Sequence, residues 1–329
     1  MRGDALARTT VGGVSEWPRP SALARELVRG GYDLHVHVAP DVMRRRIDDL
    51  GLARRFRDVG LAGFVLKSHY VPTAERAAVV SAAVPEVEAL GALVLNGAVG
   101  GLNPVAVEIA AREGARVVWL PTVDARNQRE SRAAAPPEAT PPMWARIQEE
   151  LERQGVVSPP VDVVDADGAV TAELRRVLAV IARHDLVLAS GHLSRDEIFA
   201  VVAAAFQEGV RRVVVTHPEF TSQRLSADDQ AQLAAQGAYL EHCFTTPHTG
   251  KCTWEEVLAG VRASGVERSF FSSDLGQPFN PPVEDGLALM ADRFLEAGFS
   301  EDEVRTMAVT NTATLAASGR PREPAQRPG

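Results

Sequence analysis

Two histidines separated by a single residue are the first sign of chemistry in this sequence. They are His35 and His37, in the run Asp33-Leu-His-Val-His. Residues two apart on a β-strand point to the same face, so both imidazoles would face one side of a strand here. Paired imidazoles fill a core poorly and bind divalent metals well. The pair alone is a weak signal, and its interpretation depends on matching residues elsewhere in the chain.

Three further polar residues end short apolar runs later in the chain. His192 follows Ala-Ser-Gly, His217 follows Val-Val-Thr, and Asp274 follows Phe-Phe-Ser-Ser. Taken singly, a buried histidine is usually a satisfied core residue, and an aspartate at a strand end is often a helix cap. Four histidines and one aspartate that meet at one place are hard to explain in that way. The elements that would position them therefore decide the question.

These elements alternate regularly from residue 31 onward. Eight short, nearly continuous apolar runs predict strands buried on both faces, at residues 32–38, 63–68, 92–97, 116–121, 186–190, 212–216, 238–242 and 269–273. Longer amphipathic stretches predict helices at residues 46–58, 74–83, 104–113, 172–183, 195–208, 228–235, 253–264 and 284–297. Eight β-then-α units in order predict an α/β fold, a TIM-type (β/α)8 barrel. A doubly wound open sheet is the alternative.

The histidines follow the strands of this predicted barrel. Chemistry in such barrels lies at the carboxyl ends of the strands. His184 precedes the fifth strand and is expected to be structural, but the other seven fall at or just past a strand end: His35, His37, His69, His192, His217, His242 and His248. Random scatter would not produce this placement. It predicts a site for one or two divalent metal ions, with ligands from His35, His37, His192, His217 and Asp274.

The chain resembles the amidohydrolase superfamily over about residues 31–315. The resemblance rests on the strand-by-strand placement of ligands. The runs Asp-Leu-His-Val-His-Val-Ala-Pro-Asp and Val-Leu-Lys-Ser-His-Tyr are also similar to a bacterial branch of that superfamily. The resemblance implies a first metal site made by His35, His37 and Asp274. It implies that His192 and His217 bind a second metal or share in binding the first.

Lys67 marks a departure from that superfamily. Members with two metals often bridge them with a carboxylated lysine on the fourth strand, where this chain reads Val-Val-Trp-Leu-Pro-Thr. The second strand instead places Lys67 and His69 on one face, and the chain has only one other lysine, Lys251. A buried lysine can lose its proton and act as nucleophile, metal ligand or carbamate, whereas arginine stays protonated. The alternative is that Lys67 pairs with a carboxylate at the pocket rim.

Six residues are weaker candidates, for contact with the substrate: His69, Tyr70, Arg126, Glu241, His242 and His248. Glu241 and His242 are neighbours on a strand and face opposite ways, so only one of them should reach the barrel axis. Arg126 would hold a substrate carboxylate with its forked guanidinium, or lie exposed to solvent. The glycines within residues 97–101 would let a ligand approach the backbone, although a plain turn explains them as well.

Composition limits the class of protein. The net charge of −8 argues against binding to nucleic acid, and no apolar stretch reaches the ~18 residues of a membrane span. Two cysteines form no disulfide framework and the first 20 residues lack a secretory pattern, so we expect a soluble cytoplasmic protein, with a homo-oligomer left open.

The domain organisation follows from the same pattern. We expect an N-terminal extension over residues 1–30, the barrel over 31–319 and a disordered tail over 320–329. A long connection, 124–168, follows the fourth strand. Connections of this length are often lids or binding loops, and the alternative is a surface excursion without function.

The site predicts a metal-dependent hydrolase that cleaves an amide, cyclic amide or ester (lactone) bond of a small-molecule substrate through a metal-activated water. Asp274 would accept the proton of that water and pass it to the leaving group, with Lys67 and His217 completing the catalytic set. Zn²⁺ is expected first because the ligands are mainly imidazole, with Mn²⁺, Fe²⁺ and Co²⁺ as alternatives. A metal-dependent decarboxylase or hydratase, a phosphoesterase and a non-catalytic binding barrel are the competing interpretations.

Overall fold

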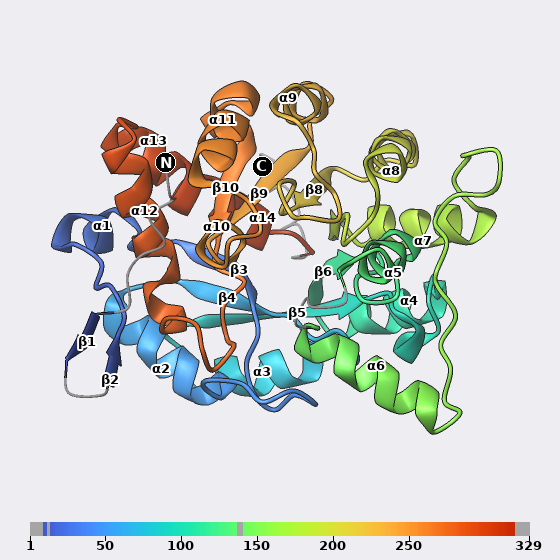
Figure 1. The fold of residues 1–329 in the computed structure, drawn as a ribbon, viewed down its shortest axis with the longest axis horizontal. Helices are drawn as coiled ribbons and strands as arrows, with labels where there is room; N and C mark the ends of the chain where they lie inside the picture. The colour runs from blue at the N-terminus through green and yellow to red at the C-terminus, as the bar shows by residue number, and fades with distance from the viewer. Residues whose placement is uncertain (1–8, 12–13, 137–140, 320–329) are drawn as a thin grey trace, which may run out of the picture.

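The predicted barrel is present in the computed structural model of the protein, which describes residues 9–11, 14–136 and 141–319. Eight parallel strands follow one another around the sheet in chain order (Figure 1). They are β3 Tyr32–Val36, β4 Gly63–Leu66, β5 Glu88–Val94, β6 Ala115–Trp119, β7 Val187–Ala189, β8 Arg212–Thr216, β9 Tyr239–Cys243 and β10 Ser269–Ser272. A parallel bridge between Val36 and Leu275 closes the ring. The doubly wound open sheet is therefore excluded, because its strand order would reverse partway across.

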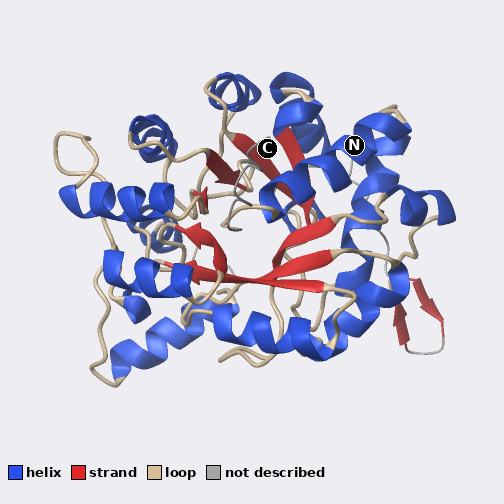
Figure 2. Ribbon diagram, turned by 180° about the vertical axis from the view of Figure 1, so that it is seen from behind, coloured by secondary structure: helices blue, strands red, loops and turns tan. Residues whose placement is uncertain are grey.

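Helices surround the strands (Figure 2). The eight that follow the barrel strands are α2 Asp49–Val59, α3 Ala74–Ala83, α4 Pro104–Arg112, α7 Ala172–Arg183, α8 Arg195–Gln207, α9 Ala227–Ala235, α11 Trp254–Ser264 and α12 Gly286–Glu296. Their starts are chemically specified: Ser194, Ser226 and Thr253 each form a capping box with the acidic residue three positions later. The alternation of apolar runs and helices therefore predicted the element order correctly.

The amino-terminal half of the barrel interior is an apolar plug, which we define as Leu34, Val65, Leu90, Val117, Val187, Val214 and Phe270. Helix α14, Asn311–Ala316, covers this end, where Leu315 and Ala316 pack against the plug. The void that remains there is about 10 Å³, which is too small for more than one water molecule. This end of the barrel is therefore filled, and ligands must enter from the other end.

Regions outside the repeated units form further elements, of which the sequence pattern indicated a helix near residues 143–154. Helix α1, Ala22–Leu27, lies within the N-terminal extension, and the Ser21 hydroxyl before it donates to Asp292 of α12 at 2.6 Å. A small hairpin, β1 Thr9–Val11 and β2 Val14–Glu16, lies at the periphery (Figure 1). The long connection contains two helices, α5 Arg126–Ala133 and α6 Met143–Arg153. The predicted disordered tail, 320–329, falls outside the described residues.

Candidate metal centre

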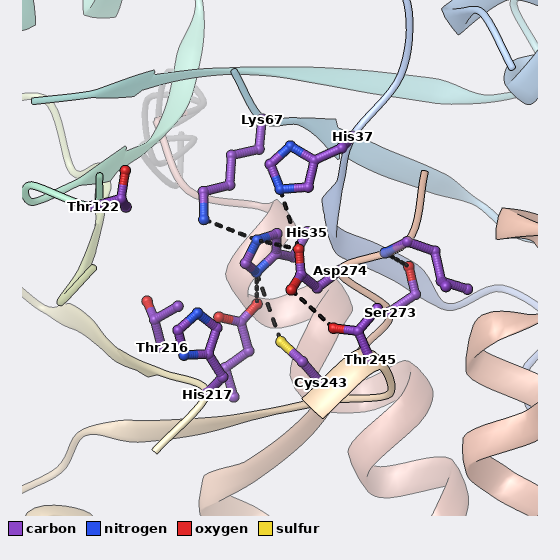
Figure 3. Close-up of polar contacts among 12 residues, drawn as sticks. His35, His37, Lys67, Thr122, Thr216, His217, Cys243, Thr245, Ser273 and Asp274 are labelled. Atoms are coloured by element: carbon purple, nitrogen blue, oxygen red, sulfur yellow. Dashed lines mark hydrogen bonds and ion pairs between the residues drawn. The ribbon is translucent and has the colours of Figure 1, made fainter. Parts of the chain in front are cut away.

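Three predicted ligands converge where β3 and β10 end. The Nε2 atoms of His35 and His37 lie 3.3 and 3.1 Å from the same oxygen, Oδ1 of Asp274. These side chains point toward one another in Figure 3. The three offer ligand atoms that all lie within 4.8 Å of one another, and the two histidines are buried. The structure therefore brings the predicted first site together.

A bulge in β3 explains how both histidines come to face inward. The pairing of β3 with β4 shifts register between Asp33 and Val36. Before the shift, Leu34 faces the barrel interior with the apolar plug, whereas Val36 packs in the outer core beneath the helices. The bulge changes which alternate residues face inward, so that His35 and His37 follow Leu34 on the inside.

The carboxyl end of β10 reaches the site through an unusual backbone. Asp274 has φ of 51°, in the left-handed region that residues other than glycine rarely adopt. At Gly276 a Cβ atom would lie 1.6 Å from the carbonyl oxygen of His37, so only glycine fits there. The Thr245 hydroxyl donates to Asp274 Oδ2 at 2.9 Å and holds the second carboxylate oxygen. Backbone strain of this kind accumulates at functional sites because the surrounding structure maintains it.

The other ring nitrogen of His35 contacts strand β9. Its Nδ1 lies 3.2 Å from Glu241 Oε1 and 3.7 Å from the Cys243 sulfur. A carboxylate accepts the Nδ1 proton, which leaves the lone pair of Nε2 directed toward Asp274. Metal-binding histidines are commonly oriented by such a carboxylate. Glu241 is thus the residue of the Glu241–His242 pair that reaches the axis, whereas His242 turns outward and contacts Glu219 at 2.9 Å.

Five imidazoles form a closed ring around the mouth of the barrel, and we call this set the histidine ring. Its ring centroids are separated by 5.4 Å from His35 to His37 and by 5.1 Å from His37 to His69. The next centroid distances are 6.4 Å from His69 to His192, 5.0 Å from His192 to His217 and 6.1 Å from His217 back to His35. The structure therefore places His217 beside His35 and His192 beside His69, so the predicted second pair of ligands lies in the same ring as the first pair.

Burial lowers the pKa values of four of these imidazoles, those of His37, His69, His192 and His217. It lowers the pKa of His37 to about 3, with help from the positive charge of Arg45. It also lowers the pKa values of His69, His192 and His217 well below their ordinary range. A neutral imidazole has a free lone pair, so these four residues offer metal ligands over the whole physiological pH range.

Lys67 lies inside the same cluster. Its Nζ is 2.9 Å from His35 Nε2 and 5.0 Å from the centre of the Trp119 ring, and the residue is 3% exposed. Burial lowers the pKa of Lys67, although the carboxylates of Asp274 and Glu241 act in the opposite direction. The pKa of Asp274 is well below its ordinary range, because His35, His37 and Lys67 outweigh the cost of its burial. The centre therefore contains an ionised carboxylate beside a lysine of weakened basicity.

These residues fit a divalent metal. Imidazole nitrogens and a carboxylate oxygen are the usual ligands of Zn²⁺ and related ions. Two buried polar atoms at the centre, His192 Nδ1 and Glu241 Oε2, have no hydrogen-bond partner among the described residues. Buried polar atoms are rarely left without partners unless a site uses them.

The remaining predicted residues are distributed differently. Arg126 does not join the centre: its guanidinium pairs with Asp162, with Nη2 to Oδ2 at 2.8 Å. His248 stacks on Phe244 with the centroids 4.8 Å apart. His69 and Tyr70 remain beside the centre, with their rings 6.2 Å apart.

Sequence reasoning missed several residues of the centre. Cys243 is two positions after Glu241 on β9, so the alternation of the strand could have placed it inside. Arg45 lies 3.4 Å from His37 Nδ1 and pairs with buried Asp41 at 2.7 Å, in a loop whose course no periodicity indicates. Thr245 begins a short helix, α10 Thr245–His248, just past the end of β9, where the sequence carries no directional signal.

Solved structures share the barrel fold of this chain. An amidohydrolase from Pseudomonas aeruginosa matches with a TM-score of 0.59 at 11% identity, over 92% of this chain and 99% of that one. A dipeptidase described as a metallopeptidase matches with a TM-score of 0.54 at 13% identity, over 88% and 99%. An amidohydrolase from Burkholderia multivorans, solved with bound zinc, matches with a TM-score of 0.52 at 13% identity, over 88% and 99%. The resemblance to the amidohydrolase superfamily is thus confirmed in the fold.

The chain belongs to the family described as "Family of unknown function (DUF6282)", which it matches over residues 30–241. This match begins before β3 and ends within β9, so it includes all five members of the histidine ring but not Asp274. The comparison with curated proteins finds no match. Among the described residues, no helix has the length and apolar character needed to cross a membrane.

Proposed function

We propose that this protein is a metal-dependent hydrolase that cleaves an amide, cyclic amide or ester bond of a small molecule. The observation that carries the proposal is the convergence of His35 Nε2 and His37 Nε2 on Asp274 Oδ1 at the open end of the barrel. The opposite end is filled by the apolar plug, so a substrate would reach the carboxyl ends of the strands.

His35, His37 and Asp274 would hold the first metal ion, and His192 and His217 would hold a second or complete the coordination of the first. A divalent metal supplies Lewis acidity, which polarises a carbonyl group and lowers the pKa of water. Zn²⁺ suits this mainly imidazole set best, whereas Mn²⁺, Fe²⁺ and Co²⁺ accept the same ligands. The zinc in the solved Burkholderia multivorans structure supports the same choice of ion.

Asp274 would act as the proton acceptor in the reaction. Its low pKa keeps the carboxylate ionised, and Thr245 holds Oδ2 in a fixed orientation. The carboxylate would accept a proton from the attacking water and deliver it to the leaving group. His217 would remain neutral, because burial lowers its pKa, and would orient the polarised carbonyl when it does not bind metal.

Lys67 would contribute through a neutral amine. Its Nζ lies between His35 and Trp119, and burial favours loss of the proton. A neutral amine can bind metal directly or take up CO₂, with loss of a proton, to form a carbamate. Either form would supply a ligand from β4 that the fourth barrel strand, β6, does not provide.

A substrate panel tests the hydrolase proposal. The protein would be stripped with chelator, reloaded with Zn²⁺ or Mn²⁺, and assayed against amides, cyclic amides, lactones and esters. β-Keto acids, enoic acids and phosphate esters would be included as the alternative chemistries. We expect hydrolysis of at least one carboxylic acid derivative by the loaded protein and none by the stripped protein. Turnover only of keto acids, enoic acids or phosphate esters would reject the proposal.

A further inference from the structure

A cavity of about 720 Å³ lies beyond the carboxyl ends of β4, β5 and β6, and we call it the side cavity. One wall is made by Tyr70, Asp124 and the loop 97–102 that follows β5. The opposite wall is the segment 156–162 of the long connection, together with helix α6. Pockets for small organic ligands have volumes of roughly 300–1,000 Å³, so the side cavity has the size of a substrate site.

The side cavity lies next to the metal centre. Tyr70 lines the cavity, and its ring centroid is 6.2 Å from that of His69. His69 in turn stacks on His37 with the centroids 5.1 Å apart. The cavity and the histidine ring are therefore neighbours, connected through the contact between Tyr70 and His69.

The charged groups of the cavity wall are neutralised or acidic. Asp124 accepts hydrogen bonds from Gly97 N and Gln148 Nε2, both at 2.9 Å, and pairs with Arg129 at 2.5 Å. Asp162 pairs with Arg126, and Glu152 lies exposed. Among the described residues that line the cavity, no cation is thus free of a carboxylate partner. An anionic ligand would meet carboxylates there, so the electrostatics favour an uncharged ligand.

The rest of the wall is apolar apart from the Gln148 amide and the hydroxyl groups of Tyr70, Ser158 and Thr171. Leu102, Leu151 and Val157 line the cavity, and Val157 is 68% exposed in this structure. The hydroxyl oxygens of Tyr70 and Ser158 are buried and have no hydrogen-bond partner among the described residues. Burial raises the pKa of Tyr70, with further contributions from Asp41 and Asp124, so its phenol stays protonated and can donate a hydrogen bond.

The segment that forms the outer wall is fixed to the barrel. Val161 forms a parallel bridge with Ala125, and its N–H donates to Asp124 O at 2.8 Å. A Cβ atom at Gly97 would lie 1.7 Å from Ser158 Oγ, so the segment approaches the β5 loop as closely as glycine permits. Arg126 serves this anchoring role through Asp162. The described part of the long connection therefore builds a defined wall of the cavity.

We propose that the side cavity binds an uncharged, largely apolar part of the substrate, with a carbonyl or hydroxyl oxygen of that part accepting a hydrogen bond from Tyr70. The bond to be cleaved would then lie at the histidine ring. This inference rests on the proposed hydrolase function for the identity of the ligand as substrate, but binding in the cavity needs neither metal nor catalysis.

A neutral fluorescent ketone tests the binding directly. Prodan, 6-propionyl-2-dimethylaminonaphthalene, has an apolar ring and one carbonyl acceptor, and its emission reports a change in surroundings. We expect saturable one-to-one binding to the metal-free protein. The corresponding carboxylate, 6-dimethylamino-2-naphthoate, should bind about tenfold more weakly or worse, as carboxylates in the wall repel it. Equal or tighter binding of the naphthoate, or no saturable binding of prodan, would overturn the proposal.

Three variants locate the bound probe. Ala98→Trp places a large ring on a residue that lines the cavity and should abolish saturable binding, whereas Ala82→Trp, on the exposed surface of α3, should leave it unchanged. Tyr70→Phe removes only the hydroxyl and should weaken prodan binding about 2- to 10-fold. Unchanged binding in Ala98→Trp would place the probe elsewhere and refute the assignment.

A last measurement connects the cavity with the substrate. For any ester or amide that the loaded enzyme hydrolyses, prodan should inhibit competitively and Ala98→Trp should raise KM more than it lowers kcat. Non-competitive inhibition would show that the cavity is not part of the substrate site. If no substrate is hydrolysed but prodan still binds with the predicted selectivity, the hydrolase proposal fails and the ligand site stands.

Discussion

The two halves of the barrel interior differ sharply although the same strands build both. Toward the amino ends, the apolar plug is closely packed and leaves a void of about 10 Å³. Toward the carboxyl ends, neutral imidazoles, Lys67 and an ionised Asp274 occupy the space. At the carboxyl end of β4 the change occurs within two residues, from Val65 to Lys67, the residue after the strand. The comparison indicates that stability and chemistry occupy separate layers, which substitutions should be able to alter one at a time.

The double variant His35→Ala/His37→Ala should have the largest effect on the carboxyl-end layer. It removes two of the three converging ligands, so we expect metal content near zero and activity at background. Its melting temperature should stay close to that of the metal-free wild type, because the plug is untouched. Elemental analysis measures the metal content, and thermal unfolding measures the melting temperature. His184→Ala is the matched control, since His184 pairs with Glu108 away from the centre. Full metal content in the double variant would contradict the proposed ligands.

Asp274→Asn should separate proton transfer from metal binding within the same layer. The amide keeps an oxygen near His35 and His37 but cannot accept a proton. We expect kcat to fall by about 10²–10⁴-fold, with a much smaller loss of bound metal. Steady-state kinetics on protein of known metal content would show this. Near-normal turnover would assign the base elsewhere, with His217 or Glu241 the next residues to substitute.

Substitutions of Lys67 show whether the metal centre needs a neutral amine at this position or only a positive charge. If the neutral form is used, Lys67→Arg should lose activity almost as fully as Lys67→Ala, because arginine stays protonated. We expect the two variants to agree within about tenfold in kcat/KM. Substantial rescue by arginine would instead make Lys67 a charge partner of Asp274 or Glu241.

Phe270→Ala should affect the plug alone. Phe270 is 1% exposed, and its truncation should lower the free energy of unfolding by about 3–5 kcal/mol. The metal stoichiometry of the folded fraction should not change. Urea unfolding and elemental analysis test the two statements together, and Phe270→Leu provides a milder control. A parallel loss of metal at a temperature where the variant is folded would show that the layers are coupled.

The smallest expected effect is a pH dependence of stability in the metal-free protein. The folded-state pKa values of His37, His69, His192 and His217 are lowered, so below pH ~6.5 the unfolded chain binds more protons and stability falls. Asp33, whose pKa burial raises to about 7, acts in the opposite direction and offsets part of this. We expect a loss of about 1–3 kcal/mol between pH 6.5 and 5.5.

Urea unfolding of chelated protein at the two pH values measures this loss. The variant His69→Gln/His192→Gln should show less than half of the wild-type pH dependence, because it lacks two of the four histidines whose pKa values are lowered. If stability rises as the pH falls, the contribution of Asp33, whose pKa is raised, exceeds that of the histidines.

Much of the fold could be predicted from the sequence because its signals are local. Buried parallel strands appear as short apolar runs, and helix starts such as Ser194 carry their capping residues in the chain. Strand alternation also predicted correctly that Glu241 and His242 would face opposite ways. The bulge between Asp33 and Val36 left no such signal, since it arises from pairing with β4.

The candidate site was predictable only where its residues lie on strands. His35, His37, His192, His217 and Asp274 are at strand ends, and a barrel necessarily brings strand ends together. Loops carry no such rule. Arg126 was expected to contact substrate, but its partner Asp162 lies 36 residues away in the chain, and that pairing depends on how the long connection folds back.

The central claim is that His35, His37 and Asp274 hold a divalent metal at the open end of the barrel. Anomalous diffraction at the zinc absorption edge, from crystals of zinc-loaded protein, tests it most directly. We expect a peak within bonding distance of Nε2 of both histidines and of one carboxylate oxygen of Asp274. The absence of a peak there, or a zinc ion bound instead by His242 and Glu219, would contradict the claim.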